Sequence, residues 1–130
     1  MSPEVKRKVK EYQDKIVPGR LRELAELSGA DIAYEVDWDS FGADTTAINF
    51  FDNLAFHRIN MAFRHLGSDP FTKDAVKAGL KVIRLRNVKD KSQMKIEFGG
   101  GVLEVHCAYG LRLEGIYNEN DIHKVLVAGL

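Results

Sequence analysis

The chain has 130 residues, of which 45% are hydrophobic and 29% charged, a composition typical of one ordinary globular domain. Its 19 basic residues balance its 19 acidic ones, so no net positive charge attracts it to nucleic acid or to an anionic membrane. The single cysteine excludes an internal disulfide, and no segment approaches the ~20 consecutive apolar residues of a membrane span.

The N-terminal segment predicts a helix that is kinked, or two short helices. Ser2 and Pro3 are typical of a helix start, and the charged stretch after them lacks the apolar run of a secretory signal. Apolar residues then recur at helical spacing: Val5, Val9, Tyr12 and Ile16. Pro18 and Gly19 interrupt the pattern, and Gly29 ends it as a C-terminal cap would.

A half-buried strand is predicted over Asp31–Trp38, because apolar and polar residues alternate strictly there. The apolar side of this strand consists of Ile32, Tyr34, Val36 and Trp38. The longest helix is expected next, over Thr46–Leu66, with Asp44 or Thr45 as its cap and Gly67 at its end.

The C-terminal half predicts a short helix, three strands and a final helix that Asn118 can cap. The short helix is expected over Pro70–Ala78, and the strands over Leu80–Val88, Gln93–Phe98 and Val102–Tyr109. Because only short turns separate the strands, they predict an antiparallel meander with one face open to water. That open face would carry Arg84, Arg86, Lys95, Glu97, Glu104 and His106.

These elements predict one cytoplasmic domain of the α+β class, residues 1–130, in the order α-β-α-α-β-β-β-α. We expect a small antiparallel sheet of about four strands, ending in the three-stranded meander, with helices packed on one face.

The longest helix is unusual because it is apolar on two sides. A broad apolar face is joined by a narrower second flank, formed by Phe50, Leu54 and Met61. Between them runs a polar column: Asn49, Asn53, His57, Asn60 and Arg64. Since polar groups near apolar surroundings need hydrogen-bond partners, the column predicts an internal network, a solvated stripe, a ligand pocket or a subunit interface.

Charge is segregated along the chain. Ala30–Phe56 contains acidic residues but no Lys or Arg, whereas His57–Lys95 is mainly basic. One explanation is that Glu35 and Asp37 face Arg84 and Arg86 across the sheet. The other is an acidic patch that docks a basic protein: Glu35, Asp37, Asp39 and Asp44.

The sequence contains no clear catalytic or metal-binding pattern. Its histidines lack the spacing of a zinc site. His106 and Cys107 are neighbours on a strand, so their side chains point to opposite faces and cannot act as a base and a nucleophile together. Glu35 and Asp37 could couple as an acid and base pair, although surface carboxylates on strands are usually idle.

We therefore expect a non-catalytic module that binds a protein partner or a second copy of itself, through the acidic patch and the second flank. No cofactor, metal, nucleic acid or membrane is expected. The alternative is a small enzyme or small-molecule binder, whose pocket is lined by the polar column.

Overall fold

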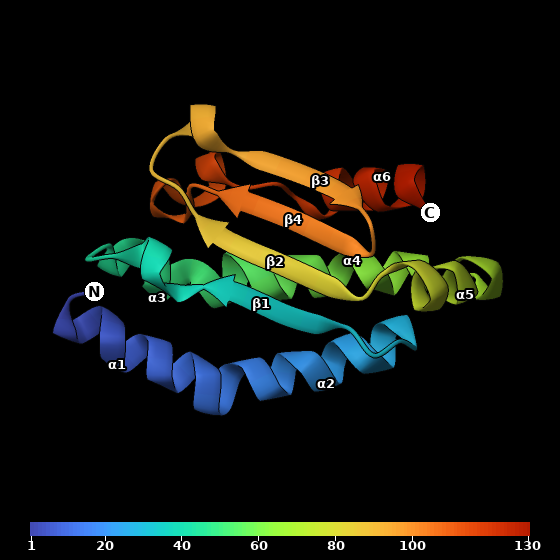
Figure 1. Cartoon of the computed structure of the whole chain (residues 1–130), viewed down its shortest axis with the longest axis horizontal. Coiled ribbons are helices and arrows are strands. Elements are labelled where there is room, and N and C mark those ends of the chain that lie inside the picture. Colours follow the sequence, from blue (N-terminus) through green and yellow to red (C-terminus); the bar gives the residue numbers. More distant parts are fainter.

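The computed structural model describes all 130 residues, arranged as one layer of strands and one layer of helices (Figure 1). The strands are β1 (Ala33–Asp37), β2 (Val82–Asn87), β3 (Lys95–Gly99) and β4 (Val102–Cys107). The α-helices are α1 (Pro3–Glu11), α2 (Val17–Ser28), α3 (Thr45–Phe51), α4 (Arg58–Leu66), α5 (Pro70–Gly79) and α6 (Glu119–Gly129). Two π-helical turns, η1 (Tyr12–Ile16) and η3 (Asp52–His57), join α1 to α2 and α3 to α4. The chain order and the α+β class are confirmed.

The first long helix runs without a break from α1 through η1 into α2. Ser2 begins it, with its hydroxyl accepting a hydrogen bond from the backbone N–H of Val5. Pro18 has no N–H, and its ring crowds the carbonyl four residues earlier, so the turn before it widens into η1. Gly29 ends the helix in the left-handed conformation, at φ 69°. The segment predicted as a kinked helix or two short helices is therefore one continuous helix with a π-helical turn at η1.

The second long helix, from α3 to α4, is continuous, but its middle is not α-helical as expected. Asp44 caps it by accepting a hydrogen bond from the N–H of Ala47. At Asp52 the N–H donates to the Tyr12 hydroxyl over 3.0 Å, and that hydroxyl donates to the carbonyl of Ile48 over 2.7 Å. In an α-helix this N–H and this carbonyl would bond to each other. The inserted hydroxyl separates them, which accounts for the π-helical turn η3.

The sheet is mixed, and the expected antiparallel meander is wrong. The strand order is β1-β2-β4-β3, with β1, β2 and β4 parallel and only β3 antiparallel to its neighbour β4. The connection after β2 contains a short 3-10 turn, η4 (Lys91–Gln93), and is long enough to pass over one strand position. The tight glycine turn after β3 then brings β4 back into the position between β2 and β3, where Leu103, Val105 and Cys107 are buried. β3 is left as a charged edge strand.

In Figure 1, α4 and α6 lie behind the strands and the first long helix runs below β1, so the second long helix occupies the middle of the helical layer. α4 packs between α2 and α6, and α3 packs against η5, a stretch of 3-10 turns at Tyr109–Gly115. Phe51, at the centre, is fully buried among aromatic rings. The helix is apolar on two sides because the sheet covers one side and α6 with η5 covers another. No helix combines the length and apolar character that a membrane span requires.

Candidate functional site

The structure divides the polar column into exposed and buried members. Asn49, Asn53 and Arg64 are exposed, and His57 is half-buried. Asn60 is the exception, because no part of it reaches the surface. A buried amide of this kind must find its hydrogen bonds within the protein.

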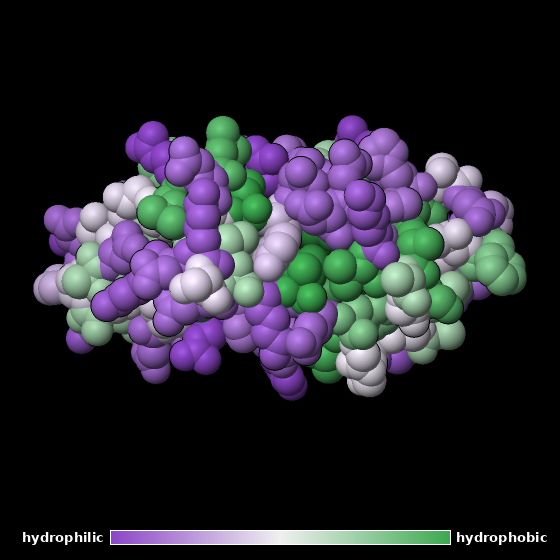
Figure 2. Space-filling model, turned by 90° about the horizontal axis from the view of Figure 1, so that it is seen from above, coloured by the Kyte–Doolittle hydropathy of each residue, from purple (hydrophilic) through white to green (hydrophobic).

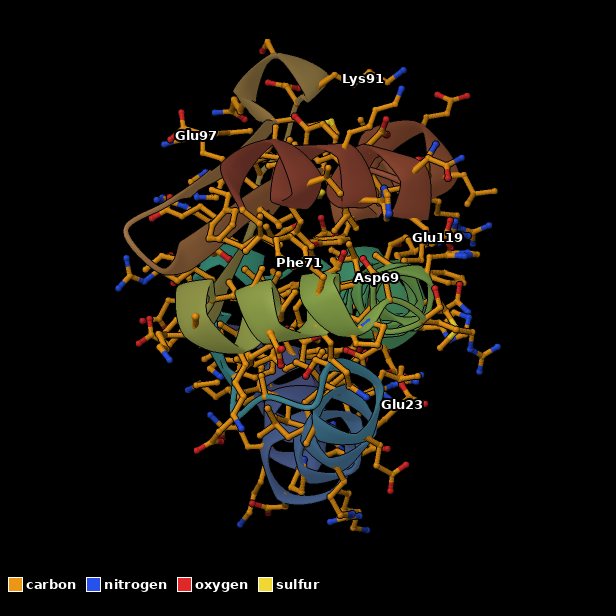
Figure 3. The ribbon with its side chains drawn as sticks, turned by 90° about the vertical axis from the view of Figure 1, so that its right-hand side faces the viewer. Glu23, Asp69, Phe71, Lys91, Glu97 and Glu119 are labelled. Carbon is orange, nitrogen blue, oxygen red and sulfur yellow. The ribbon has the colours of Figure 1, made fainter.

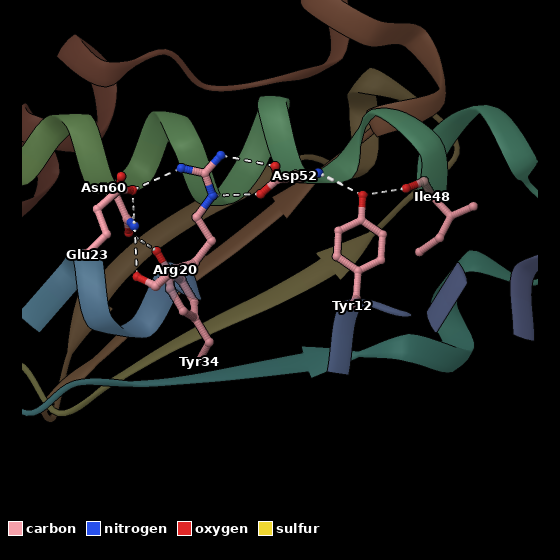
Figure 4. Close-up of polar contacts among 7 residues, drawn as sticks. All are labelled: Tyr12, Arg20, Glu23, Tyr34, Ile48, Asp52 and Asn60. Carbon is pink, nitrogen blue, oxygen red and sulfur yellow. Dashed lines mark hydrogen bonds and ion pairs between the residues drawn. The ribbon is translucent and has the colours of Figure 1, made fainter. Parts of the chain in front are cut away.

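Asn60 makes its bonds to α2 and β1 (Figure 4). Its Oδ1 accepts a hydrogen bond from the hydroxyl of Tyr34. Its Nδ2 donates to the carbonyl of Arg20 over 3.0 Å and to Oε1 of Glu23 over 2.8 Å. With these bonds made, Asn60 ties the central helix to both its neighbouring helix and the sheet.

Arg20 extends this network to the π-helical turn. Its guanidinium donates to both carboxylate oxygens of Asp52, over 2.8 and 3.0 Å, and to Glu23 over 3.0 Å. Such a two-pronged pair is among the stronger charge-assisted interactions in proteins. The hydrogen bond that Arg20 donates to Asp52 raises the pKa of Arg20, so the guanidinium stays charged. Burial alone would raise the pKa of Glu23, but hydrogen bonds from Asn60 and Arg20 bring it below its ordinary value.

The column therefore does not form the expected pocket. None of the five cavities in the structure is lined by any of its members. The side-chain oxygen and nitrogen of Asn60 are hydrogen-bonded within the protein. The exposed Asn49 and Asn53 make no side-chain hydrogen bonds to other residues. The geometry fits an internal network at Asn60 that continues into a solvated stripe.

The second flank is mostly covered, which corrects its expected role as an open contact surface. Leu54 is 6% exposed and belongs to the core, and Met61 is half-buried. Phe50 keeps 37% of its surface, but the guanidinium of Arg112 lies over its ring, 4.2 Å from the ring centre. η5 and α6 occupy the space that a partner would need.

The acidic patch is also largely engaged within the chain. Glu35 faces Arg84 in the sheet register and accepts from it over 2.7 Å. Asp37 faces Arg86, with 3.7 Å between their charged groups. These pairs confirm the explanation of the segregated charge by pairing across the sheet, between Glu35 and Arg84 and between Asp37 and Arg86. Of the other two carboxylates, Asp44 caps α3 and Asp39 is exposed.

A surface that the sequence did not single out lies between α5 and α6. Phe71 is 82% exposed, the most exposed large hydrophobic residue of the chain. It borders an apolar groove of about 160 Å³, whose other walls are Thr72, Ala75, Val127 and Leu130. Figure 3 shows Phe71 at the end of the molecule, between the two helices, and hydrophobic atoms also gather over the right-hand half of Figure 2, where α6 lies.

One signal in the sequence could have indicated this surface. Phe71 and Ala75 are one helical turn apart, on a different face of α5 from the buried Val76. A helix that buries one apolar face and keeps an exposed phenylalanine on another is a candidate for a contact. The part contributed by α6 could not be found from sequence, because it depends on how the two helices pack.

Cys107 is a core residue, as its place on the strand predicted. It is 2% exposed, while the neighbouring His106 lies on the open face of the sheet, so the two side chains diverge as expected. Burial raises the pKa of the Cys107 thiol to about 11. Elsewhere, no group of three or more His, Cys, Asp or Glu side chains is placed to hold a metal ion.

The free energy of unfolding is expected to fall as the pH rises above about 9. The pKa of Cys107 rises from 9.0 to about 11 on folding, and burial raises that of Tyr12 from 10.0 to about 12. Both groups are neutral below these values, so their contribution is complete below pH 9 and is lost as the pH rises toward 12. The Cys107 shift corresponds to on the order of 2 to 3 kcal/mol. Urea unfolding at a series of pH values measures the loss.

Cys107→Ala supplies the control for this dependence. The variant should lose less stability between pH 9 and 11 than the wild type, because the ionising thiol is gone. Identical slopes in the two proteins would show that the thiol does not carry the effect.

Comparisons with protein-family models, with curated proteins and with solved structures find no match to this chain. The fold and the surfaces above are therefore the basis for its function.

Proposed function

We propose that this chain is a protein-binding module, that it binds through the α5–α6 surface around Phe71, and that the partner is a second copy of the chain. The observation that carries the proposal is the 82% exposure of Phe71 directly beside an apolar groove. Single exposed apolar side chains are common, but an exposed ring next to a matching hollow is not explained by the fold alone.

The shapes of the ring and the groove support self-association. The groove of about 160 Å³ is close to the ~150 Å³ of an apolar cavity that holds a benzene molecule. Phe71 and the groove lie on the same patch, so two copies related by a two-fold axis can each insert a ring beside the other. Val127 and Leu130, which are 52% and 39% exposed, would be buried by the same contact.

The charge of the chain permits this association. The formal net charge is zero at pH 7, so two copies do not repel each other over long distances. Burying one phenylalanine gains about 1.5 to 3 kcal/mol, and the two-fold axis counts it twice. The half-exposed Val127 and Leu130 add about 1 kcal/mol each on both copies, which brings the gain to about 7 to 10 kcal/mol. Because association costs at least ~4 kcal/mol, at most about 6 kcal/mol remains, and we expect a weak dimer with a dissociation constant between about 40 µM and 1 mM.

The acidic patch and the second flank support binding less well. Glu35 and Asp37 already have basic partners in the sheet, and Arg112 covers the ring of Phe50. A competing surface remains on η5, where Leu111 and Leu113 are 43% and 67% exposed. It lacks a neighbouring apolar groove among the five cavities, and it provides a matched control.

Light scattering coupled to gel filtration tests the proposal. The wild-type mass should rise from 14.6 kDa toward twice that value as the concentration increases through the range given above. Phe71→Asp should remain a monomer throughout, because an uncompensated carboxylate cannot enter an apolar groove. Circular dichroism should show both proteins folded, since the Phe71 side chain is almost entirely exposed.

Leu113→Asp places the same change on the competing surface. It should dimerise like the wild type, because Leu113 is exposed on η5 and does not line the groove. A wild-type protein that stays monomeric at 1 mM would overturn the proposal. Loss of the dimer in Leu113→Asp, with Phe71→Asp unaffected, would move the interface to η5.

A further inference from the structure

The three parallel strands end together at one edge of the sheet, where polar side chains line two adjoining cavities. β1, β2 and β4 run in the same direction, so their carboxyl ends meet at this edge. In α/β sheets such ends are where ligands commonly bind, because the loops that follow them leave a crevice. Here the loop after β1 is a 3-10 turn, η2 (Trp38–Phe41), and it places Ser40 over the end of β2.

Two cavities meet at this edge. The first has a volume of about 460 Å³ and the second about 300 Å³, and Ser40, Asn87 and Lys89 line both. We call the pair the Ser40–Asn87 cleft. Its size falls in the range of small-molecule sites.

The first cavity is positively charged. Arg86, Lys89 and His106 line it, and no carboxylate does. The Lys89 ammonium takes part in no ion pair, whereas Arg86 has one long contact of 3.7 Å to Asp37. His106 lies 3.4 Å from Glu104 on the open face of the sheet. An anionic group would meet two permanent cations here, one of them free.

A neutral donor, the side-chain amide of Gln93, completes the first cavity. The Gln93 side-chain oxygen accepts hydrogen bonds from the backbone N–H groups of Lys89 and Asp90, over 3.2 and 3.1 Å. These bonds fix the amide and leave its Nε2 without an acceptor in the protein. The Ser40 hydroxyl lies at the boundary between the two cavities, where it donates to the Asp37 carbonyl over 2.5 Å and so offers no proton to a ligand.

Asn87 carries an unpaired acceptor in the same cleft. It is only 6% exposed, its backbone N–H donates to the Ser40 hydroxyl over 2.9 Å, and its Nδ2 donates to the Ser40 carbonyl over 3.4 Å. Its Oδ1 is buried and accepts no hydrogen bond. Buried acceptors are rarely left without a hydrogen bond, so we expect this oxygen to accept one from a donor outside the chain.

We propose that the Ser40–Asn87 cleft binds a small organic anion that also carries a hydroxyl or an amine. Its phosphate or carboxylate group lies between Arg86 and Lys89, within reach of Gln93. Its hydroxyl or amine donates to Asn87, and the second cavity holds the remainder of the molecule. This site is separate from the Phe71 surface and does not depend on self-association.

Nuclear magnetic resonance titration of the ¹⁵N-labelled chain tests the site with two probes, glycerol 3-phosphate and malate. Each probe has an oxyanion and a hydroxyl, so the stronger binder identifies the anionic group that the cleft prefers. Saturable shifts are expected at the backbone amides of Asn87, Lys89 and Gln93. Lys89→Met should weaken binding about tenfold, because it removes one hydrogen bond to a charged group.

Lys91→Met is the matched control. Lys91 lies two residues away on the same turn, contacts Glu114 over 3.9 Å and does not line the cleft. Its replacement should change the affinity less than twofold, because an exposed charge outside the cleft is screened by salt. If both variants weakened binding of the probes equally, the probes would be held by general charge attraction and the proposal would be overturned. Absence of saturable shifts with both probes would overturn it as well.

Discussion

Replacing Asn60 with alanine is expected to lower the free energy of unfolding by about 3 to 5 kcal/mol. Asn60 is fully buried, accepts from the Tyr34 hydroxyl, and donates to the Arg20 carbonyl and the Glu23 carboxylate. The variant leaves the Tyr34 hydroxyl without its acceptor, which costs about 1 to 3 kcal/mol, and it removes the two hydrogen bonds that Asn60 donates to α2, at about 0.5 to 1.5 kcal/mol each. Urea denaturation followed by circular dichroism gives the free energy directly.

Asn53→Ala provides the comparison on the same helix. Asn53 belongs to the same polar column, is exposed, and makes no side-chain hydrogen bond within the protein. Its replacement should change the stability by less than about 0.5 kcal/mol. If the two alanine variants were equally stable, the network at Asn60 would not hold the helices together.

Replacing Phe51 with alanine should cost about 3 to 5 kcal/mol, toward the upper end of that range. The ring is completely buried and lies 4.8 to 5.9 Å, centre to centre, from five other rings. These are Tyr12, Trp38, Phe41, Phe56 and Tyr109. They are held by η1, η2, η3 and η5, which cannot collapse independently into the space left behind. The same denaturation experiment measures this loss.

Phe50→Ala is the neighbouring control. Phe50 precedes Phe51 on α3 but keeps 37% of its surface, and the Arg112 guanidinium lies over its ring. We expect a loss of about 1 kcal/mol, from that contact and partial burial. A larger loss from Phe50 than from Phe51 would reverse the assignment of the buried face of the helix.

Local patterns predicted most of the elements. The strict alternation of β1 identified its buried side, and Asp44 and Asn118 cap their helices as expected. The partners of Glu35 and Asp37 could be proposed because strands with opposite charges tend to pair. Each of these features depends on residues close in sequence, or on one strand and its neighbour.

The strand order could not be predicted in the same way. The turn after β2 favoured a hairpin, but the choice between pairing with β3 and pairing with β4 depends on which strand buries more apolar surface. Leu103 and Val105 give β4 the buried central position, while the charges of β3 leave it at the edge. That comparison depends on the whole core and cannot be made from local sequence patterns.

The polar column shows both the use and the limit of sequence reasoning. The pattern correctly required hydrogen-bond partners for a buried amide, and Asn60 has them. Which residues they are follows from the packing of α2 against α4, so Arg20 and Glu23 were not foreseen. The Tyr12 hydroxyl that opens the π-helical turn was missed for the same reason.

The most direct measurement of the binding surface uses a mixture of isotope-labelled and unlabelled chains at about 1 mM, the upper end of the expected dissociation range. Isotope-filtered nuclear Overhauser spectra then record only contacts between copies. We expect signals from the Phe71 ring of one copy to the methyl groups of Val127 and Leu130 of the other. Signals that instead join copies through Asn53 and His57 of the polar column, or no signals between copies at all, would contradict a dimer built on Phe71.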